Sequence, residues 1–194
     1  MKKFLLASAM TAFAATGALA EETTYTVDTT HAQIVYHYSH LGFSTTYGMF
    51  SGIAGEIQFD DADPAASSVS VSFPITSLFT GDDERTAHFK TDDFFGAEAN
   101  PEGTFTSTSI EVTGDNTAKI TGDLTLNGIT KSVVLDTTMT QKGDHPMAGK
   151  PWIGFNATTT LVRSEFDMGM YAPYVSDEVE VFISIEAMDN GADG

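Results

Sequence analysis

The chain has 194 residues, which suits a single domain, and its 27 acidic and 9 basic residues give a formal net charge of −18 at pH 7. Such a charge repels nucleic acid and anionic membrane surfaces, which bind proteins through clusters of Lys and Arg. The chain contains no cysteine, which excludes thiol nucleophiles, iron–sulfur clusters and zinc sites with Cys ligands.

The N-terminal segment has the pattern of an export signal. Lys2 and Lys3 precede an apolar run over 4–19, and residues 18–20, Ala-Leu-Ala, have the small-x-small form of a signal-peptidase site. This run is short for a bilayer span, and no later stretch is apolar enough to cross one. The sequence therefore predicts a signal peptide over 1–20, export to the periplasm and no stable membrane insertion.

Residues 21–188 have the alternating hydrophobicity of β-strands. Apolar and polar residues alternate most clearly over 68–75, 120–126 and 179–185, which places one face of each strand in a dry interior. Further strands are expected over 25–28, 32–41, 47–60, 104–113, 130–140 and 154–163. The remaining residues, 189–194, are expected to form an acidic disordered tail.

Short turn signals separate these strands. Asn127-Gly128 is the clearest hairpin signal, because a type I′ turn needs a positive φ at both central positions. Many antiparallel strands without βαβ spacing are typical of a sandwich or a closed barrel. The sequence therefore predicts one all-β domain over 21–188.

One segment departs from the β pattern. Residues 81–90 begin with acidic capping residues and place Arg85, His88 and Phe89 at helical spacing. They lead into an aromatic loop that contains Phe94 and Phe95. A short helix followed by such a loop is suited to cover the mouth of a barrel.

Three histidines near the N-terminus raise the question of a zinc site. On a strand, however, His37 and His40 point to opposite faces, so both cannot bind one ion without a bulge. His40 shares a face with Tyr36 and Tyr38, and we expect this face to point inward. We therefore predict that His31, His37 and His40 form no metal site.

Catalytic motifs are missing from the sequence. Ser164 lacks the glycines of a nucleophile elbow, and no HExxH zinc motif, Gly-rich phosphate loop or dinucleotide fingerprint occurs. Met168 and Met170 have the spacing of copper ligands, but no organised His or Cys accompanies them, which favours packing at a barrel rim. We expect no catalytic residue and no cofactor.

Several short motifs occur in the order of a known family. They are Tyr25-x-x-Asp28, His40-Leu41-Gly42, the helix with Arg85 and His88, Asp93-Phe94-Phe95, Asn100-Pro101, the run 120–131, Arg163-Ser164-x-Phe166 and the run 175–179. The chain thereby resembles the YceI-like family of bacterial periplasmic proteins, also called polyisoprenoid-binding. The resemblance covers nearly all of residues 21–188 and implies an extended, lipocalin-like antiparallel barrel closed at one end. It also implies an isoprenoid chain in the lumen, as in a prenylquinone or prenylphenol, or a fatty amide in its place, and an association with stress.

The chemistry of such a ligand agrees with the strand pattern. An apolar chain in water must be wrapped nearly completely, at about 25 cal/mol per Å² removed from water, and a barrel of about eight strands is the size that holds one small ligand. Arg85 and His88 are expected either to meet a polar head at the barrel mouth or to anchor the helix through a salt bridge to Asp92 or Asp93. The expected ligand-binding residues are Tyr36, Tyr38, His40, Phe50, Phe73, Arg85, His88, Phe89, Phe94, Phe95 and Phe105.

Three functions remain open at this stage. The leading hypothesis is binding, transport or storage of a long isoprenoid lipid without catalysis. A second is a lipid-modifying enzyme of low specificity that uses His40, His88 and inward tyrosines for acid–base chemistry. A third is a partner that delivers a quinone to a membrane redox complex such as a cytochrome, with its acidic surface steering a basic partner. A homodimer also stays open.

Overall fold

The computed structural model describes residues 22–191, so the predicted signal peptide at 1–20 lies outside the described residues. The strands are β1 (Thr23–Val27), β2 (Gln33–His40), β3 (Ser44–Ser51), β4 (Ala54–Phe59), β5 (Ser68–Pro74), β6 (Glu102–Gly114), β7 (Thr117–Leu126), β8 (Ile129–Asp144), β9 (Pro151–Val162) and β10 (Glu178–Asp189). The helical elements are the α-helix α1 (Asp83–Phe89) and the 3-10 helices η1 (Pro64–Ala66), η2 (Ile75–Ser77) and η3 (Arg163–Phe166).

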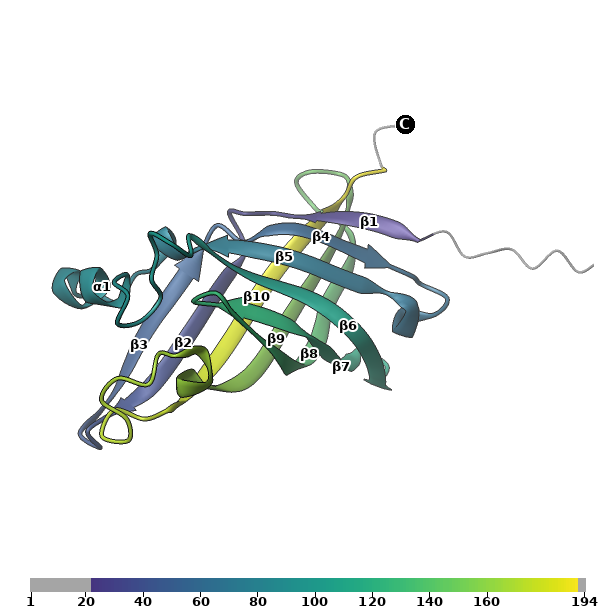
Figure 1. Cartoon of the computed structure of the whole chain (residues 1–194). Helices are drawn as coiled ribbons and strands as arrows, with labels where there is room; N and C mark the ends of the chain where they lie inside the picture. The colour runs from purple at the N-terminus through teal and green to yellow at the C-terminus, as the bar shows by residue number, and fades with distance from the viewer. Residues whose placement is uncertain (1–21, 192–194) are drawn as a thin grey trace, which may run out of the picture.

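The strands form one antiparallel sheet that closes on itself (Figure 1). The ring runs β1–β4–β5–β6–β7–β8–β9–β10, and β10 pairs back with β1. The result is an antiparallel barrel of 8 strands, which confirms the all-β barrel predicted from the sequence. Closure pairs the backbone groups that an open sheet would leave free at its edges.

The hairpin of β2 and β3 prolongs the barrel at one end. The same edge of β10 pairs with β2 through 180–184 and with β1 through 187–189, so β1 and β2 follow one another along β10 and are separated by the turn at 28–32. The strand expected over 47–60 is likewise divided into β3 and β4, which corrects the prediction. The break falls at Gly52, whose φ of 71° is incompatible with an extended strand, and at the buried Ile53.

The hairpin between β7 and β8 has the predicted turn. Asn127 has a φ of 48° and Gly128 a φ of 71°, as a type I′ turn requires at both positions. The Asn127 side chain donates to the carbonyl of Phe166 at 3.2 Å and accepts from Asn100 at 3.2 Å. The turn is therefore joined to the end of η3 and to the loop that precedes β6.

The C-terminal strand extends further than the sequence suggested. β10 includes Asp189, and the backbone N–H of Asn190 donates to the carbonyl of Thr24 at 3.0 Å. Thr26 also donates to the Asn190 side chain at 2.8 Å. The disordered tail predicted from 189 onward is therefore wrong for its first two residues, because β1 supplies an antiparallel partner for them.

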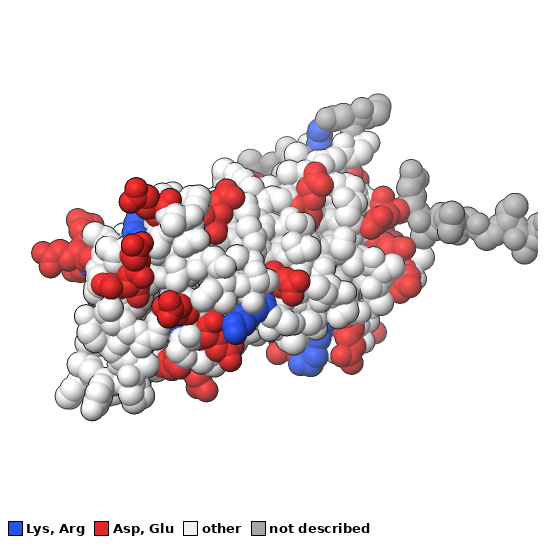
Figure 2. All heavy atoms as spheres, viewed as in Figure 1, with Lys and Arg blue, Asp and Glu red and all other residues white. Residues whose placement is uncertain are grey.

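Charged side chains are scattered over the outside of the barrel, and most of those in view are acidic (Figure 2). The core lies inside, where one large cluster of buried residues joins seven of the ring strands, and partly buried side chains of β8 pack against it. Within residues 22–191, no helix has the length and apolar character to cross a membrane.

Candidate functional site

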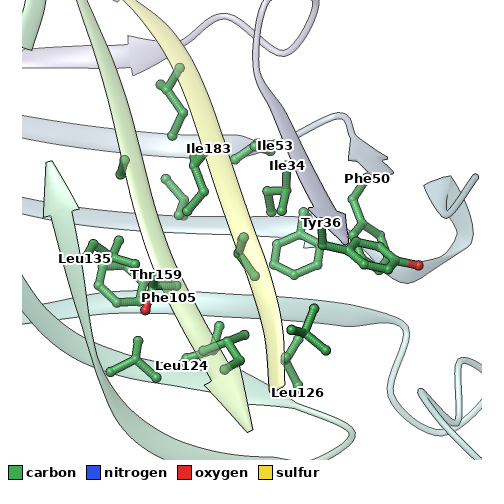
Figure 3. Close-up of a pocket in the computed structure, with 18 of the residues that line it drawn as sticks. Ile34, Tyr36, Phe50, Ile53, Phe105, Leu124, Leu126, Leu135, Thr159 and Ile183 are labelled. Carbon is green, nitrogen blue, oxygen red and sulfur yellow. The ribbon is translucent and has the colours of Figure 1, made fainter. Parts of the chain in front are cut away.

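The barrel encloses an apolar cavity of about 880 Å³ (Figure 3). This volume lies in the upper part of the range for sites that bind small molecules, about 300–1,000 Å³. Its wall is built by the inward residues of strands β2 to β10 and by residues of α1 and the segment that follows η3. The cavity therefore runs through the interior of the fold and is not a surface cleft.

The period-two pattern of the strands creates the wall. On β7 and β8, Leu124, Leu126 and Leu135 point into the cavity, and Ile183 does so from β10 (Figure 3). Val134, next to Leu135, is exposed on the outer surface. The alternation of inner and outer residues thus supplies an apolar wall and a polar exterior from the same strands.

Aromatic rings form a cluster on one side of the cavity. Phe50 lies between Phe73 and Phe95, with ring centroids 5.1 Å and 5.4 Å away, and Tyr36 is 5.8 Å from Phe50. Separations of this size are typical of packed aromatic pairs. The cluster joins β2, β3 and β5 to the loop after α1.

All the residues predicted to bind a ligand line this cavity: Tyr36, Tyr38, His40, Phe50, Phe73, Arg85, His88, Phe89, Phe94, Phe95 and Phe105. Tyr36 and Tyr38 are buried and face inward, whereas His40 is exposed at the rim. The structure therefore brings the set together around one space. Contact of these side chains with a ligand stays a prediction.

The helix α1 and its following loop lie across one end of the barrel (Figure 1). The Asp82 carboxylate caps the helix by accepting from the Arg85 backbone N–H at 2.8 Å. Phe89, at the end of the helix, packs against Phe94 with ring centroids 4.6 Å apart and against Tyr38 at 6.4 Å. The segment thus contributes aromatic side chains to the wall of the cavity.

The two polar residues of α1 have different partners. His88 Nε2 lies 3.1 Å from Asp93 Oδ2, which is the helix-anchoring contact considered from the sequence. Arg85 instead donates from Nη2 to the carbonyl of Thr80 at 2.8 Å, and within residues 22–191 it forms no ion pair. Its Nε is buried and has no hydrogen-bond partner.

A second buried polar atom without a partner is the hydroxyl oxygen of Tyr36. Burial, together with the nearby Tyr38, raises the pKa of Tyr36, and the Arg85 charge opposes this shift; the hydroxyl is therefore neutral and can donate its proton to an acceptor. An unsatisfied buried group of this kind costs about 1–3 kcal/mol. Two donors, Tyr36 Oη and Arg85 Nε, are therefore available to an oxygen atom inside the cavity.

Arg163 lines the cavity from η3, and its role was missed by the sequence analysis. Arg163 is 9% exposed, and its guanidinium donates to the carbonyls of Ser176 at 2.9 Å, Met170 at 2.8 Å, Val175 at 2.9 Å and also Met168. Burial lowers the pKa of Arg163, and the nearby Asp177 opposes this effect. The Arg163-Ser164-x-Phe166 motif was noted, but no local pattern indicates that the arginine faces inward.

Other wall residues were also missed although their strands were expected. Phe155, Thr159 and Leu161 line the cavity from β9, and Val133 and Met139 line it from β8. Both segments were expected to be strands. The period-two alternation along them was the signal that could have identified these wall residues. Only the choice of inward face was left undecided.

Two of the three histidines considered for zinc lie beside carboxylates of their own. His37 Nε2 lies 3.2 Å from a Glu180 carboxylate oxygen on the outer surface, and His31 Nδ1 lies 2.8 Å from Asp28 Oδ2. Within the described residues, Asp28, His31 and Glu186 offer donor atoms within 4.8 Å of one another. His31 is exposed there, and the Asp28 carboxylate already accepts from Thr30.

The closed antiparallel barrel and its apolar interior define a class of proteins that can enclose one small ligand. Within that class, the chain belongs to the YceI-like family, because residues 25–187 match the family model described as YceI-like domain. This confirms the resemblance found in the sequence.

Relatives match nearly the whole chain. Protein YceI of Escherichia coli is 38% identical over 192 residues, which cover 97% of this chain and 98% of that protein. The crystal structure of Burkholderia cenocepacia BcnA matches with a TM-score of 0.74 and 25% identity, covering 83% of this chain and 99% of that one. A polyisoprenoid binding domain from Saccharophagus degradans shares the fold, with a TM-score of 0.66, 13% identity and 86% and 99% coverage.

Proposed function

We propose that this protein binds one long apolar isoprenoid lipid, of the prenylquinone or prenylphenol type, inside the barrel and carries or stores it in the periplasm. The observation that carries the proposal is the apolar cavity of about 880 Å³. Transfer of an apolar chain from water into such a wall is favourable by about 25 cal/mol per Å². This favourable transfer supports binding as the role of the cavity.

The extent of the cavity supports an elongated ligand. Its lining includes Arg85 and His88 of α1 and also Asn116 of the β6–β7 turn. In Figure 1, α1 and this turn lie at opposite ends of the barrel. A space that runs along the strands suits a chain better than a compact molecule.

The polar atoms without partners support a ligand with one polar end. Tyr36 Oη and Arg85 Nε are buried donors, and a quinone carbonyl or phenol oxygen would accept from them. The rest of the wall is dominated by aliphatic and aromatic side chains, which suits an isoprenoid tail. We therefore assign the head of the lipid to the end of the barrel beside α1.

Two further observations support the ligand class and the location. The sequence resembles proteins called polyisoprenoid-binding, and a solved domain of that description shares the fold. The pattern of residues 1–20 favours export to the periplasm, where an apolar lipid needs an enclosed carrier to cross water.

The test is to express the full precursor, purify the protein from periplasm without detergent, and record native mass spectra before organic extraction. We expect a one-to-one complex whose extract has the mass of an isoprenoid quinone or prenylphenol. Extraction of a fatty acid or fatty amide would keep the lumen as a lipid site but overturn the isoprenoid class. A protein without lipid that also fails to take up added prenylquinone would overturn the proposal.

Neighbouring positions on β9 offer a matched pair of variants. Ala157 is buried and lines the cavity, whereas Thr158 is exposed on the outer face. Ala157→Phe places a ring inside the lumen and should reduce lipid occupancy, while Thr158→Phe should leave it unchanged. Equal occupancy in the two variants would contradict binding in the lumen.

A further inference from the structure

A group of exposed apolar side chains lies at the tip of the β2–β3 hairpin and in the segment beside it, next to the rim of the cavity. Leu41 is 49% exposed and Phe43 is 92% exposed in the turn of the hairpin, and Tyr171 and Tyr174 are 60% and 77% exposed in the segment after η3. We call these four residues the apolar lip. Exposed apolar groups that gather in one place mark an interaction site.

The two segments of the lip are joined by backbone hydrogen bonds. The Leu41 N–H donates to the Tyr174 carbonyl at 2.9 Å, and the Ser176 N–H donates to the Ser39 carbonyl at 2.9 Å. From behind the lip, the Arg163 guanidinium binds the carbonyls of Met170 and Val175. The hydrogen bonds therefore join the two segments of the lip into one surface.

Two residues of the lip have a strained backbone conformation. Leu41 has a φ of 55° and Tyr171 a φ of 66°, both in the left-handed region that large apolar residues rarely adopt. Strain of this kind persists where the surrounding structure imposes it, and it is common at functional sites. Within residues 22–191, the two apolar residues with a φ in this region, Leu41 and Tyr171, both belong to the lip.

The lip also differs from the rest of the molecule in charge. The chain carries a net charge of −18, yet the stretches 39–49 and 168–176 contain no Asp, Glu, Lys or Arg. Figure 2 shows the corresponding tip, at the lower left, without charged atoms on this face. The acidic body would be repelled by an anionic surface, whereas the uncharged tip meets no such barrier at a neutral one.

The lip is continuous with the cavity. Tyr171 of the lip lines the cavity together with the rim residues His40 and Ser44. A surface bound by the lip would therefore face the opening of the lumen. Phe and Leu insert into the apolar region of a bilayer, and Tyr prefers its interface, where the ring is apolar and the hydroxyl is wet.

We propose that the apolar lip docks the barrel, mouth first, on the uncharged surface of a lipid bilayer, so that lipid passes between the membrane and the lumen without crossing water. This inference rests on the proposed function, because it gives the route by which the lumen is loaded or emptied.

The test measures sedimentation of the purified protein with vesicles of dioleoylphosphatidylcholine. We expect binding that falls about tenfold in Phe43→Ser and again in Tyr174→Ser, since each removes one inserted aromatic side chain. Met147→Ser is the matched control. Met147 is 91% exposed but precedes β9 at the end of that strand opposite to the lip, so its replacement should leave vesicle binding unchanged. Adding phosphatidylglycerol should weaken binding of the wild-type protein.

A second measurement separates this inference from the proposed function. Transfer of prenylquinone from vesicles should slow in Phe43→Ser, while the amount held after loading from ethanol stays equal to that of the wild type. A wild-type protein that holds prenylquinone but does not sediment with vesicles would overturn docking alone. Lip-dependent sedimentation without any lipid in the lumen would support docking and overturn the carrier function. Loss of dimers in Phe43→Ser, with no vesicle binding by wild type, would assign the lip to a second copy and overturn docking.

Discussion

The ring of Tyr36 covers the backbone of Gly48, its direct antiparallel partner on β3, so closely that a Cβ at Gly48 would lie 2.3 Å from Cζ and Oη of the tyrosine. Phe73 covers its partner Gly103 in the same way, with a distance of 2.3 Å from such a Cβ to Cζ. Aromatic residues paired with glycine can lie against the strand instead of standing upright in the interior. These pairs help to keep the lumen open although its wall is rich in large rings.

Gly48→Ala should therefore force the Tyr36 ring away from β3 and into the lumen. We expect a loss of about 1–3 kcal/mol in the free energy of unfolding, as for other overpacked interiors, together with lower lipid occupancy. Denaturant unfolding and native mass spectrometry measure the two effects. In a Tyr36→Leu background the alanine should cost little, so an unchanged cost in that background would contradict the steric explanation.

Removal of the Tyr36 hydroxyl should have opposite effects on stability and on binding. Tyr36→Phe deletes a buried polar atom without a partner, so the protein free of lipid should be as stable as wild type or up to about 1–3 kcal/mol more stable. Affinity for a prenylquinone should fall about tenfold if the hydroxyl donates to the head. Thermal unfolding and a quinone titration provide the measurements.

Tyr38→Phe is the matched control for this experiment. Tyr38 lines the same cavity, but its side chain is hydrogen-bonded to Thr46. Loss of that bond should lower stability by about 1 kcal/mol and should affect the head group less. If both variants behave alike, the assignment of the head to Tyr36 is wrong.

Arg163→Lys should loosen the apolar lip. A lysine cannot satisfy the four carbonyls that the guanidinium binds, so we expect a loss of about 3 kcal/mol in stability and faster hydrogen exchange over 167–177. Hydrogen-exchange mass spectrometry resolves this segment from the rest of the barrel. Lys119→Gln, which breaks only an exposed ion pair with Asp136, should change stability by about 1 kcal/mol or less.

The Asp28–His31 contact should make stability depend on pH. The hydrogen bond from His31 lowers the pKa of Asp28 to about 2, and the same contact raises the pKa of His31. The Asp28 contribution is present above its unfolded pKa of about 4 and is lost as pH falls through its folded value. The His31 contribution is present below its unfolded pKa of about 6.5 and is lost as pH rises through its folded value.

Wild type should therefore exceed His31→Gln in stability most clearly near pH 5, with a smaller difference at pH 8 and at pH 2. Urea unfolding at these three pH values measures the difference, which screening by solvent at the exposed His31 keeps small. A difference that grows toward pH 8 would contradict the expected direction.

Much of the site was predictable because its signals are local. Period two over 120–126 and 179–185 indicated the wall strands, and Asn127-Gly128 indicated the turn that the structure contains. Residues 81–90 predicted the helix that the structure places at 83–89, and the shared face of Tyr36 and Tyr38 was correctly assigned to the interior. The signal peptide, the location and the ligand stay predictions.

What the sequence by itself determined was the kind of element, the alternation of two faces along each strand and the apolar character of the interior, because these depend on neighbouring residues. The tertiary structure alone decided that β3 and β4 separate at Gly52, that Asn190 pairs with Thr24, that Tyr36 covers Gly48 and that Arg163 binds four carbonyls. Three of these features join residues that lie apart in the chain, and the break at Gly52 lies where the pairing of β3 with β2 ends and the pairing of β4 with β1 and β5 begins. Closure of the barrel brings such partners together, and no periodicity within one strand encodes which distant residue it will meet.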